Sequence, residues 1–213
     1  LTLVIALPLG ICAAIYLHEF AKQNQFTHII RTMIDITTGI PSIIFGLVGA
    51  IVFIPMMNKT IQSSGGSIAS GALTLTIILL PTIIKTTEES LKAIPNSYRM
   101  ASLALGASKS QTTFKVILPN AVFGILTATL LSIGRIIGES AALIYAVGTA
   151  IKDSVAINEK STSLAVHIWS LMGGENPNYE LSCAISIIIL LIVGLVSLGV
   201  KLISRTINKT EVK

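Results

Sequence analysis

Five long apolar runs constrain the fold of this chain more than any other feature of its sequence. They cover approximately residues 1–17, 39–57, 67–84, 119–149 and 181–203. A helix needs roughly 20 residues to cross a bilayer. Hydrophobic residues make up 52% of the chain and charged residues only 12%, which is far from the usual soluble balance. The sequence therefore predicts an all-α, polytopic membrane protein with about five transmembrane helices.

Two of these runs have additional features. The fourth is longer than one crossing needs, and because three glycines could bend it, we expect a tilted or broken helix. The first begins at residue 1 with neither Met nor a basic segment before it, so it is not typical of a signal peptide, and we expect a further part of the protein to precede it. The bending glycines are Gly134, Gly138 and Gly148. The glycines expected to let helices approach closely are Gly46, Gly49, Gly194 and Gly199.

The basic residues predict how the chain is oriented in the membrane. Cytoplasmic loops carry an excess of Lys and Arg. If segment 85–118 is cytoplasmic, segment 18–38 and the C-terminal tail are cytoplasmic too, and most of the 15 Lys and Arg residues then lie inside. The opposite orientation would reverse this bias. Residues from about 151 to 180, which include the only tryptophan, Trp169, are accordingly predicted to form a partly ordered outer loop.

The polar stretch from about 88 to 118 is predicted to be a cytoplasmic loop with defined helices. Its charged residues cannot lie in hydrocarbon, yet Asn96 and Ser97 are candidate N-caps for a helix over 97–105. Gly106 is placed to end that helix in a left-handed conformation. Residues 108–119 then form a second helix. A structured loop at the membrane surface is better suited to being held by a partner than to joining two spans.

The second helix of this loop has its own start and stop signals. Ser108 and Gln111, three residues apart, form a predicted capping box. Pro119 is expected to close the helix.

Arg135 and Glu139 are the two charged residues inside the fourth run. At positions i and i+4 they would share one helix face and could pair. Charged groups at that depth usually face a protein interior or an aqueous path. One interpretation is an internal salt bridge that only neutralises both groups. The other is an anion contact on a permeation route, because the planar arginine fork suits a tetrahedral oxyanion.

Other chemistry is not indicated by the sequence. There is no GxxxxGK[ST] motif, so we expect no ATP bound through a P-loop, and no catalytic constellation, so we expect a protein that is not an enzyme. Cys12 and Cys183 lie inside apolar runs and do not form a disulfide framework or a metal motif. The net charge of +5 is distributed between the apolar segments, which favours membrane topology over nucleic-acid binding.

The polar loop resembles the cytoplasmic coupling loop of ABC-importer permeases. That family's pattern is Glu-Ala-Ala, three residues, Gly, nine residues and Ile-x-Leu-Pro. Gly106 fills the glycine position and residues 116–119, Val-Ile-Leu-Pro, supply the ending, whereas residues 100–102, Met-Ala-Ser, replace Glu-Ala-Ala. The resemblance implies contact with an ATPase subunit through Asn96, Ser97, Tyr98, Ala101, Leu105, Gly106, Ala107, Ser108 and Pro119.

A narrower resemblance, to the phosphate-importer permeases, covers nearly the whole chain, 1–213, as one permease domain. Segments 6–21, 34–49, 78–108 and 124–143 carry it, and residues 86–89, Thr-Thr-Glu-Glu, are similar to the A-type subunit of the permease pair. It implies a six-span subunit, of which this chain would keep the last five, in a bacterial or archaeal cytoplasmic membrane. It also implies that Arg135 and Glu139, in the family's GR-x-x-GE segment, lie along the translocation path.

The resemblance further implies a set of partners. These are a second permease subunit, expected in a heterodimer, two cytoplasmic ATPase subunits that hold ATP and Mg, an external phosphate-binding protein and the membrane lipid. The chain itself would bind no cofactor and no metal.

Two other functions remain open from the residues. One is a permease for a different oxyanion, such as molybdate or sulfate. The other is an autonomous channel or secondary transporter, which would need no coupling loop. Transport measured with and without the ATPase would discriminate these classes.

Overall fold

The computed structural model describes residues 1–63, 65–151, 156–174 and 176–211, with the side chains of 203–211 left out. The described residues form helices and no strands. Lys152, in the predicted outer loop, and Lys213, in the predicted basic tail, lie outside the described residues. In chain order the elements are α1 Thr2–Ile15, η1 Tyr16–Phe20, α2 Gln25–Thr38, α3 Ser42–Val48, η2 Gly49–Phe53, α4 Ile54–Ile61, α5 Ile68–Lys92, α6 Asn96–Ala104, α7 Lys109–Thr112, η3 Thr113–Ile117, α8 Leu118–Asn120, α9 Val122–Gly138, α10 Ala141–Ala146, α11 Leu164–Met172 and α12 Tyr179–Glu211, where η marks a π-helix.

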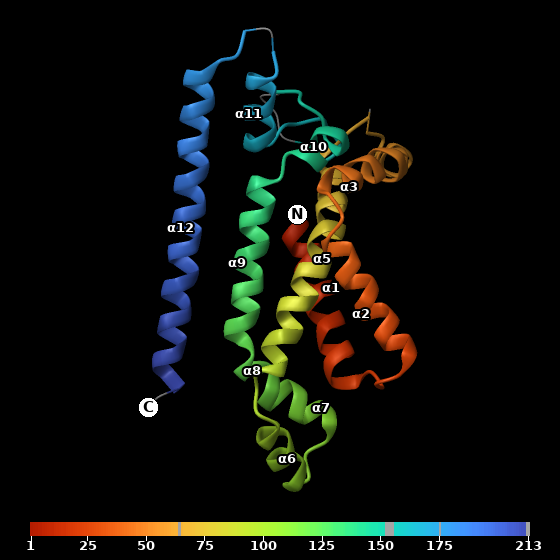
Figure 1. Ribbon diagram of the computed structural model, residues 1–213, viewed down its shortest axis with the longest axis vertical. Helices are drawn as coiled ribbons and strands as arrows, with labels where there is room; N and C mark the ends of the chain where they lie inside the picture. Colours follow the sequence, from red (N-terminus) through yellow and green to blue (C-terminus); the bar gives the residue numbers. More distant parts are fainter. Residues whose placement is uncertain (64, 152–155, 175, 212–213) are drawn as a thin grey trace.

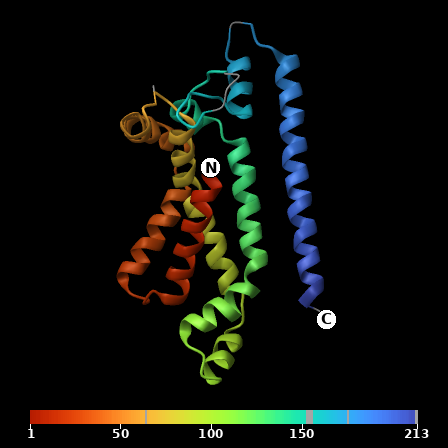
Figure 2. The ribbon, with the colours of Figure 1, turned by 180° about the vertical axis from the view of Figure 1, so that it is seen from behind.

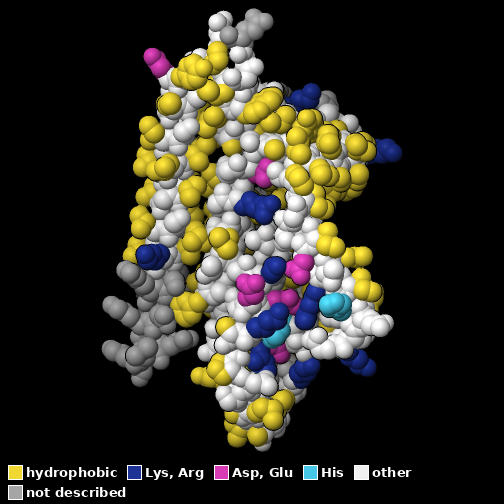
Figure 3. Space-filling view, viewed as in Figure 1, with side chains coloured by type: hydrophobic (Ala, Val, Ile, Leu, Met, Phe, Trp, Pro, Cys, Tyr) yellow, Lys and Arg dark blue, Asp and Glu magenta, His cyan; other side chains and the backbone are white. Residues whose placement is uncertain are grey.

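The longer helices α1, α2, α5, α9 and α12 run along the long axis of the molecule (Figures 1 and 2). Helices α6 and α7 lie at one end, and α10 and α11 lie at the other. Lys and Arg side chains gather over the half that carries α6 and α7 on the face shown in Figure 3. This distribution agrees with the cytoplasmic side predicted for residues 85–118.

Four helical segments of the described chain are long and apolar enough to cross a membrane, or five if a bent pair is counted as one span. The four are Thr2–Phe20, Ser42–Ile61, Ile68–Lys92 and Tyr179–Leu202, and the bent pair is Lys109–Asn120 with Val122–Gly138. They correspond to the five predicted runs, so the prediction of an all-α membrane fold is confirmed.

The fourth run is a broken helix, as its glycines predict. Helix α9 ends at Gly138, the backbone is extended at Glu139, and the short helix α10 follows. A positive φ of 103° at Gly148 lies just beyond α10. The single crossing expected over 119–149 is therefore confined to the α9 part of that run, with a turn at its outer end.

The greater part of segment 18–38, which the charge pattern predicts to be cytoplasmic, is helix α2, which lies along α1 and α5 (Figure 1). The predicted span over 39–57 corresponds to the continuous helical stretch Ser42–Ile61, which lies across the outer end of the molecule in both ribbon views. Arg31 of α2 also packs against α5, because its Nη2 lies 3.3 Å from Glu88 Oε1.

Helix α5 forms the centre of the bundle and α12 lies at its edge. An 18-residue apolar window of α5 is 67% buried in the protein, whereas the corresponding window of α12 is 6% buried. Buried residues of α1 and α5 pack together, with Ile136 of α9 against them; they are Ala6, Leu79 and Ile83. The apolar sides of α12 are therefore available to lipid or to another subunit.

Two of the glycines predicted to allow close helix approach do so. A Cβ at Gly46 would lie 2.7 Å from Cα and 2.8 Å from the carbonyl oxygen of Ala142 in α10, and a Cβ at Gly49 would overlap the Thr74 side chain. By contrast, a Cβ at Gly134, Gly138, Gly194 or Gly199 would meet nothing within 4 Å. The close-approach prediction is therefore confirmed at Gly46 and Gly49, and these four other glycines make no such approach within the described chain.

We expect Gly46→Ala to destabilise the folded protein by about 1–3 kcal/mol, because the added methyl group must displace the backbone of α10. The measurement is the thermal unfolding midpoint in detergent. Gly194→Ala is the matched control, because its methyl group meets open space. An unchanged midpoint for Gly46→Ala would contradict the close approach of α3 and α10.

Candidate functional site

The coupling segment, residues 93–121, begins later than the sequence suggests. Helix α5 continues through Lys92, so residues 88–92, which belong to the predicted loop, are its last turns. Glu88 is buried on this helix. Glu88 pairs with Arg31 of α2, so this polar residue belongs to the helix bundle instead of marking an exposed loop.

Helix α6 begins with Pro95 as its N-cap, not with Asn96 or Ser97. Its first side chains make no capping hydrogen bond, and the Pro95 carbonyl accepts from the Tyr98 N–H at 3.2 Å. Proline holds φ near the helical value and is pre-organised to begin a helix. Asn96 is therefore the first helical residue, and the helix ends at Ala104 instead of residue 105.

The predicted left-handed conformation of Gly106 and the predicted capping box of the second helix are both confirmed. Gly106 has a φ of 83°, in the left-handed region. The Ser108 N–H donates to Gln111 Oε1 at 2.9 Å, and the Gln111 N–H donates to Ser108 Oγ at 3.2 Å, which completes the capping box. Pro119 does not end the second helical stretch. It lies at the start of α8, and the chain bends by 63° at the break between Asn120 and Val122.

The residues expected to contact an ATPase are brought together at one end of the molecule. All except the half-buried Ala107 are exposed. Leu105 is 89% exposed, and the same segment carries other exposed large apolar side chains; these are Tyr98, Met100, Leu103 and Phe114. An apolar surface of this kind is typical of a protein interaction site.

Ser102 has a role that sequence reasoning missed. Its hydroxyl lies 2.9 Å from the hydroxyl of Thr112, so it joins α6 to α7. Ser102 occupies the third position of the Met-Ala-Ser that replaces Glu-Ala-Ala. The departure from the family pattern therefore leaves the two coupling helices connected.

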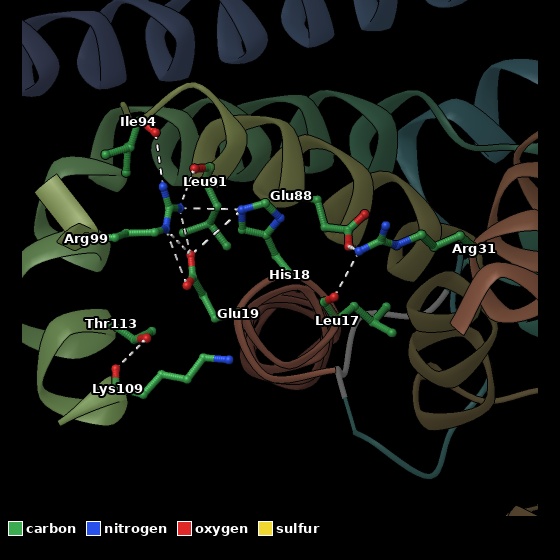
Figure 4. Close-up of polar contacts among 10 residues, drawn as sticks. All are labelled: Leu17, His18, Glu19, Arg31, Glu88, Leu91, Ile94, Arg99, Lys109 and Thr113. Carbon is green, nitrogen blue, oxygen red and sulfur yellow. Dashed lines mark hydrogen bonds and ion pairs between the residues drawn. The ribbon is translucent and has the colours of Figure 1, made fainter. Parts of the chain in front are cut away.

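Arg99 connects the coupling segment to two transmembrane helices (Figure 4). Its Nη2 donates to Glu19 Oε1 at 2.7 Å and to the Leu91 carbonyl at 3.0 Å, and its Nη1 donates to the Ile94 carbonyl at 3.1 Å. His18 Nε2 lies 3.4 Å from the same Nη2 and 3.7 Å from Glu19 Oε1. The contacts of Arg99 with Glu19 and His18 join residues about 80 positions apart, and no local pattern in the sequence indicates them.

Arg31 makes a second connection on the same side of the bundle. Its Nη2 donates to the Leu17 carbonyl at 2.9 Å and lies 3.3 Å from Glu88 Oε1 (Figure 4). The nearby Lys85 and Asp35 are paired at 2.9 Å, but their side chains are 49% and 59% exposed. The pair of half-buried Arg31 with buried Glu88 joins α2 to α5, whereas an exposed pair contributes little.

Arg135 and Glu139 do not share a helix face, because α9 ends between them. Half-buried Arg135 donates from Nη1 to Thr82 Oγ1 of α5 at 3.4 Å. The buried Glu139 accepts from the Ala142 N–H at 3.3 Å and so caps α10. The described ion pairs do not include these two residues. The predicted i, i+4 pairing is therefore wrong, and Thr82 is a contact that the sequence did not indicate.

The helices and the segment described above agree with the protein family that the chain matches. The family profile described as "Binding-protein-dependent transport system inner membrane component" matches residues 6–209. The chain belongs to this family. Its members' description, together with the several apolar helices, makes the chain a multi-pass membrane protein with a transport role.

Relatives within this permease family have names that specify a transporter. A probable ABC transporter permease protein, YqgI, of Bacillus subtilis is 33% identical over 80% of this chain and 61% of its own length. The phosphate transport system permease proteins PstA of Haemophilus influenzae and Yersinia pestis are 36% and 39% identical, over 78% and 67% of this chain and 57% and 46% of their own lengths. The chain thus spans about half the length of these relatives.

Solved permease structures share the fold. A chain of the MetNI methionine ABC transporter in an inward-facing conformation matches with a TM-score of 0.73 and 22% identity, over 97% of this chain and 87% of that chain. A chain of an amino acid ABC transporter with histidines matches with a TM-score of 0.65 and 15% identity, over 96% of this chain and 88% of that chain. At these identities the likeness shows the fold of the permease family.

Proposed function

We propose that this chain is a permease subunit of an ATP-driven importer that moves inorganic phosphate across the cytoplasmic membrane. The observation that carries this proposal is the half-buried Arg135 on α9, which faces the hydroxyl of Thr82 on α5 and has no carboxylate partner among the described ion pairs. A half-buried cation without a carboxylate partner is able to receive an anion. The PstA relatives support phosphate as that anion.

The mechanism we propose uses the shape of the arginine. Its planar fork presents several N–H donors to a tetrahedral oxyanion, and the Thr82 hydroxyl can donate another hydrogen bond beside it. An anion in a low-dielectric region is costly without such partners, so the pair lowers the barrier to crossing. Glu139 is held away by its bond to α10 and does not compete for the guanidinium.

The coupling segment is proposed to bind an ATPase subunit. Its exposed apolar residues, including Leu105 and Tyr98, would lie in a groove of the ATPase, and the capped α7 would keep them in place. The full complex is then a heterodimer of this chain with a second permease, two ATPase subunits that hydrolyse ATP with Mg, and an external phosphate-binding protein. This chain holds none of the ATP chemistry itself.

The test is uptake of radiolabelled phosphate by proteoliposomes that contain the complete complex and its binding protein. We expect uptake that requires ATP and resists competition by sulfate and molybdate. Uptake of one of those anions instead would replace phosphate as the substrate. Uptake that continues when the ATPase subunits are omitted would favour an autonomous channel and would contradict the proposal.

A further inference from the structure

We propose that Arg99 and Glu19 form the link through which the coupling segment moves α1, and through α1 the anion site at Arg135. This inference rests on the proposed function, because it assigns two positioning residues to the same transport cycle. Neither residue touches the anion. Both lie at the point where α6, the end of α1 and the end of α5 meet (Figure 4).

The first step is the attachment of Arg99 to α5. In a helix the Leu91 carbonyl would accept from the N–H four residues later, but that residue is Pro95, which has no N–H. Arg99 Nη2 supplies the missing donor at 3.0 Å. The guanidinium of α6 thus completes the end of α5, and the two helices keep a fixed relation across the short connection at residues 93–95.

The second step is the attachment of Arg99 to α1. The Glu19 carboxylate is 8% exposed and receives Nη2 at 2.7 Å and Nε at 3.2 Å. It lies on the π-helix η1, which directly continues α1. π-Helical turns are frequently found at functional sites. A buried carboxylate that loses its partner is strongly destabilised, so a displacement of Arg99 must carry Glu19 and the end of α1 with it.

The third step joins α2 to the same unit. Leu17 belongs to the last turns of the first helix, where carbonyls lack helical donors, and its carbonyl accepts from Arg31. Arg31 in turn pairs with the buried Glu88 of α5. The contacts therefore form a closed circuit through α5, α6, η1 and α2.

The last step leads to the anion site. Ala6 of α1 belongs to the buried cluster with Leu79 and Ile83 of α5, and Ile136 of α9 packs against that cluster. Ile136 follows Arg135 in the chain. Because a packed core is not continuously deformable, movement of α1 changes the position of Arg135 relative to Thr82.

The experiment compares Glu19→Gln and Arg99→Lys with the parent in the complete complex in proteoliposomes. Glu19→Gln removes the charge without changing the size of the side chain, and Arg99→Lys keeps a charge but loses the fork that reaches both carbonyls. The measurement is phosphate moved per ATP hydrolysed. We expect this ratio to fall by about tenfold in each variant, with basal ATP hydrolysis and assembly retained. Asp35→Asn, which breaks the exposed pair with Lys85, is the control and should keep the parental ratio.

A second measurement follows α1 directly. Cys12 is an exposed, free thiol on α1. With Cys183→Ser and cysteine-free partner subunits, an environment-sensitive fluorophore on Cys12 should shift its emission when ATP binds in the parent and in Asp35→Asn, and should not shift in Glu19→Gln or Arg99→Lys. This readout would not follow from a role in stability alone.

The outcomes separate this inference from the proposed function. The link is overturned if either assembled variant moves as much phosphate per ATP hydrolysed as the parent does, or if the parent shows no emission shift. A parent that shows the shift but carries sulfate or molybdate overturns only the substrate, and the ratio is then measured with that anion.

Discussion

We expect Arg135→Ala to lower ATP-driven phosphate uptake by about 100-fold, an effect of the size seen when one donor to a developing or bound oxyanion is removed. The subunit should still assemble, because Arg135 is only half-buried and its single described partner is the Thr82 hydroxyl. Uptake by proteoliposomes, normalised to the amount of complex recovered, is the measurement. Arg135→Lys keeps the charge and loses the fork, so it should retain about a tenth of the parental rate.

The structure supplies a matched control for this prediction. Glu139→Gln keeps an oxygen that accepts from the Ala142 N–H, so uptake should remain within about threefold of the parent. If the two charges only neutralised each other, replacing both with apolar residues would restore assembly and uptake together. A double variant that carries phosphate at the parental rate would therefore dispose of a role for Arg135 on the path.

The second large effect is expected at Gly106. Gly106→Val should remove the stimulation of ATP hydrolysis by the phosphate-loaded binding protein, while the permease remains in the membrane. The reason is conformational: a Cβ at this position would meet nothing within 4 Å, but the φ of 83° is one that a β-branched residue resists. The connection between α6 and α7 would have to change, and with it the surface around Leu105.

Gly106→Asn tests the same explanation from the other side. Asparagine tolerates the left-handed region, so this variant should keep most of the stimulation although it adds a larger polar side chain. Normal stimulation in Gly106→Val would rule out docking of the coupling segment as two helices with a fixed turn. Equal losses of stimulation in both variants would show that the added side-chain volume, not the backbone conformation, causes the effect at position 106.

Features that depend on neighbouring residues were predictable from the sequence. The left-handed glycine at 106 and the capping box of Ser108 and Gln111 are formed because their partners lie within a few positions. The spans were also predictable, because each apolar run is continuous in the sequence. The N-cap at Pro95 was missed, because polar side chains next to it gave the stronger statistical signal.

Features that depend on packing were not predictable in this way. The charge of Arg31 predicted only the side of the membrane for its segment, and the position of Glu88 on a different helix explains how α2 packs against the bundle. Arg135 and Glu139 have the spacing of a helical pair, and the break after Gly138 separates them. The contacts of Arg99, Glu19 and Thr82 could not be predicted because they join segments far apart in the sequence.

The replacement of a backbone donor by the Arg99 side chain has an evolutionary consequence. Pro95 and Arg99 constitute one compensated unit, because the proline creates the unsatisfied Leu91 carbonyl and the arginine satisfies it. A descendant that exchanges the proline for a residue with an N–H still needs a long cation at position 99, because the Glu19 carboxylate is buried against it. A descendant that loses the arginine leaves both the Leu91 carbonyl and the Glu19 carboxylate without this donor. Divergence in this lineage is therefore expected to change position 95 more freely than position 99.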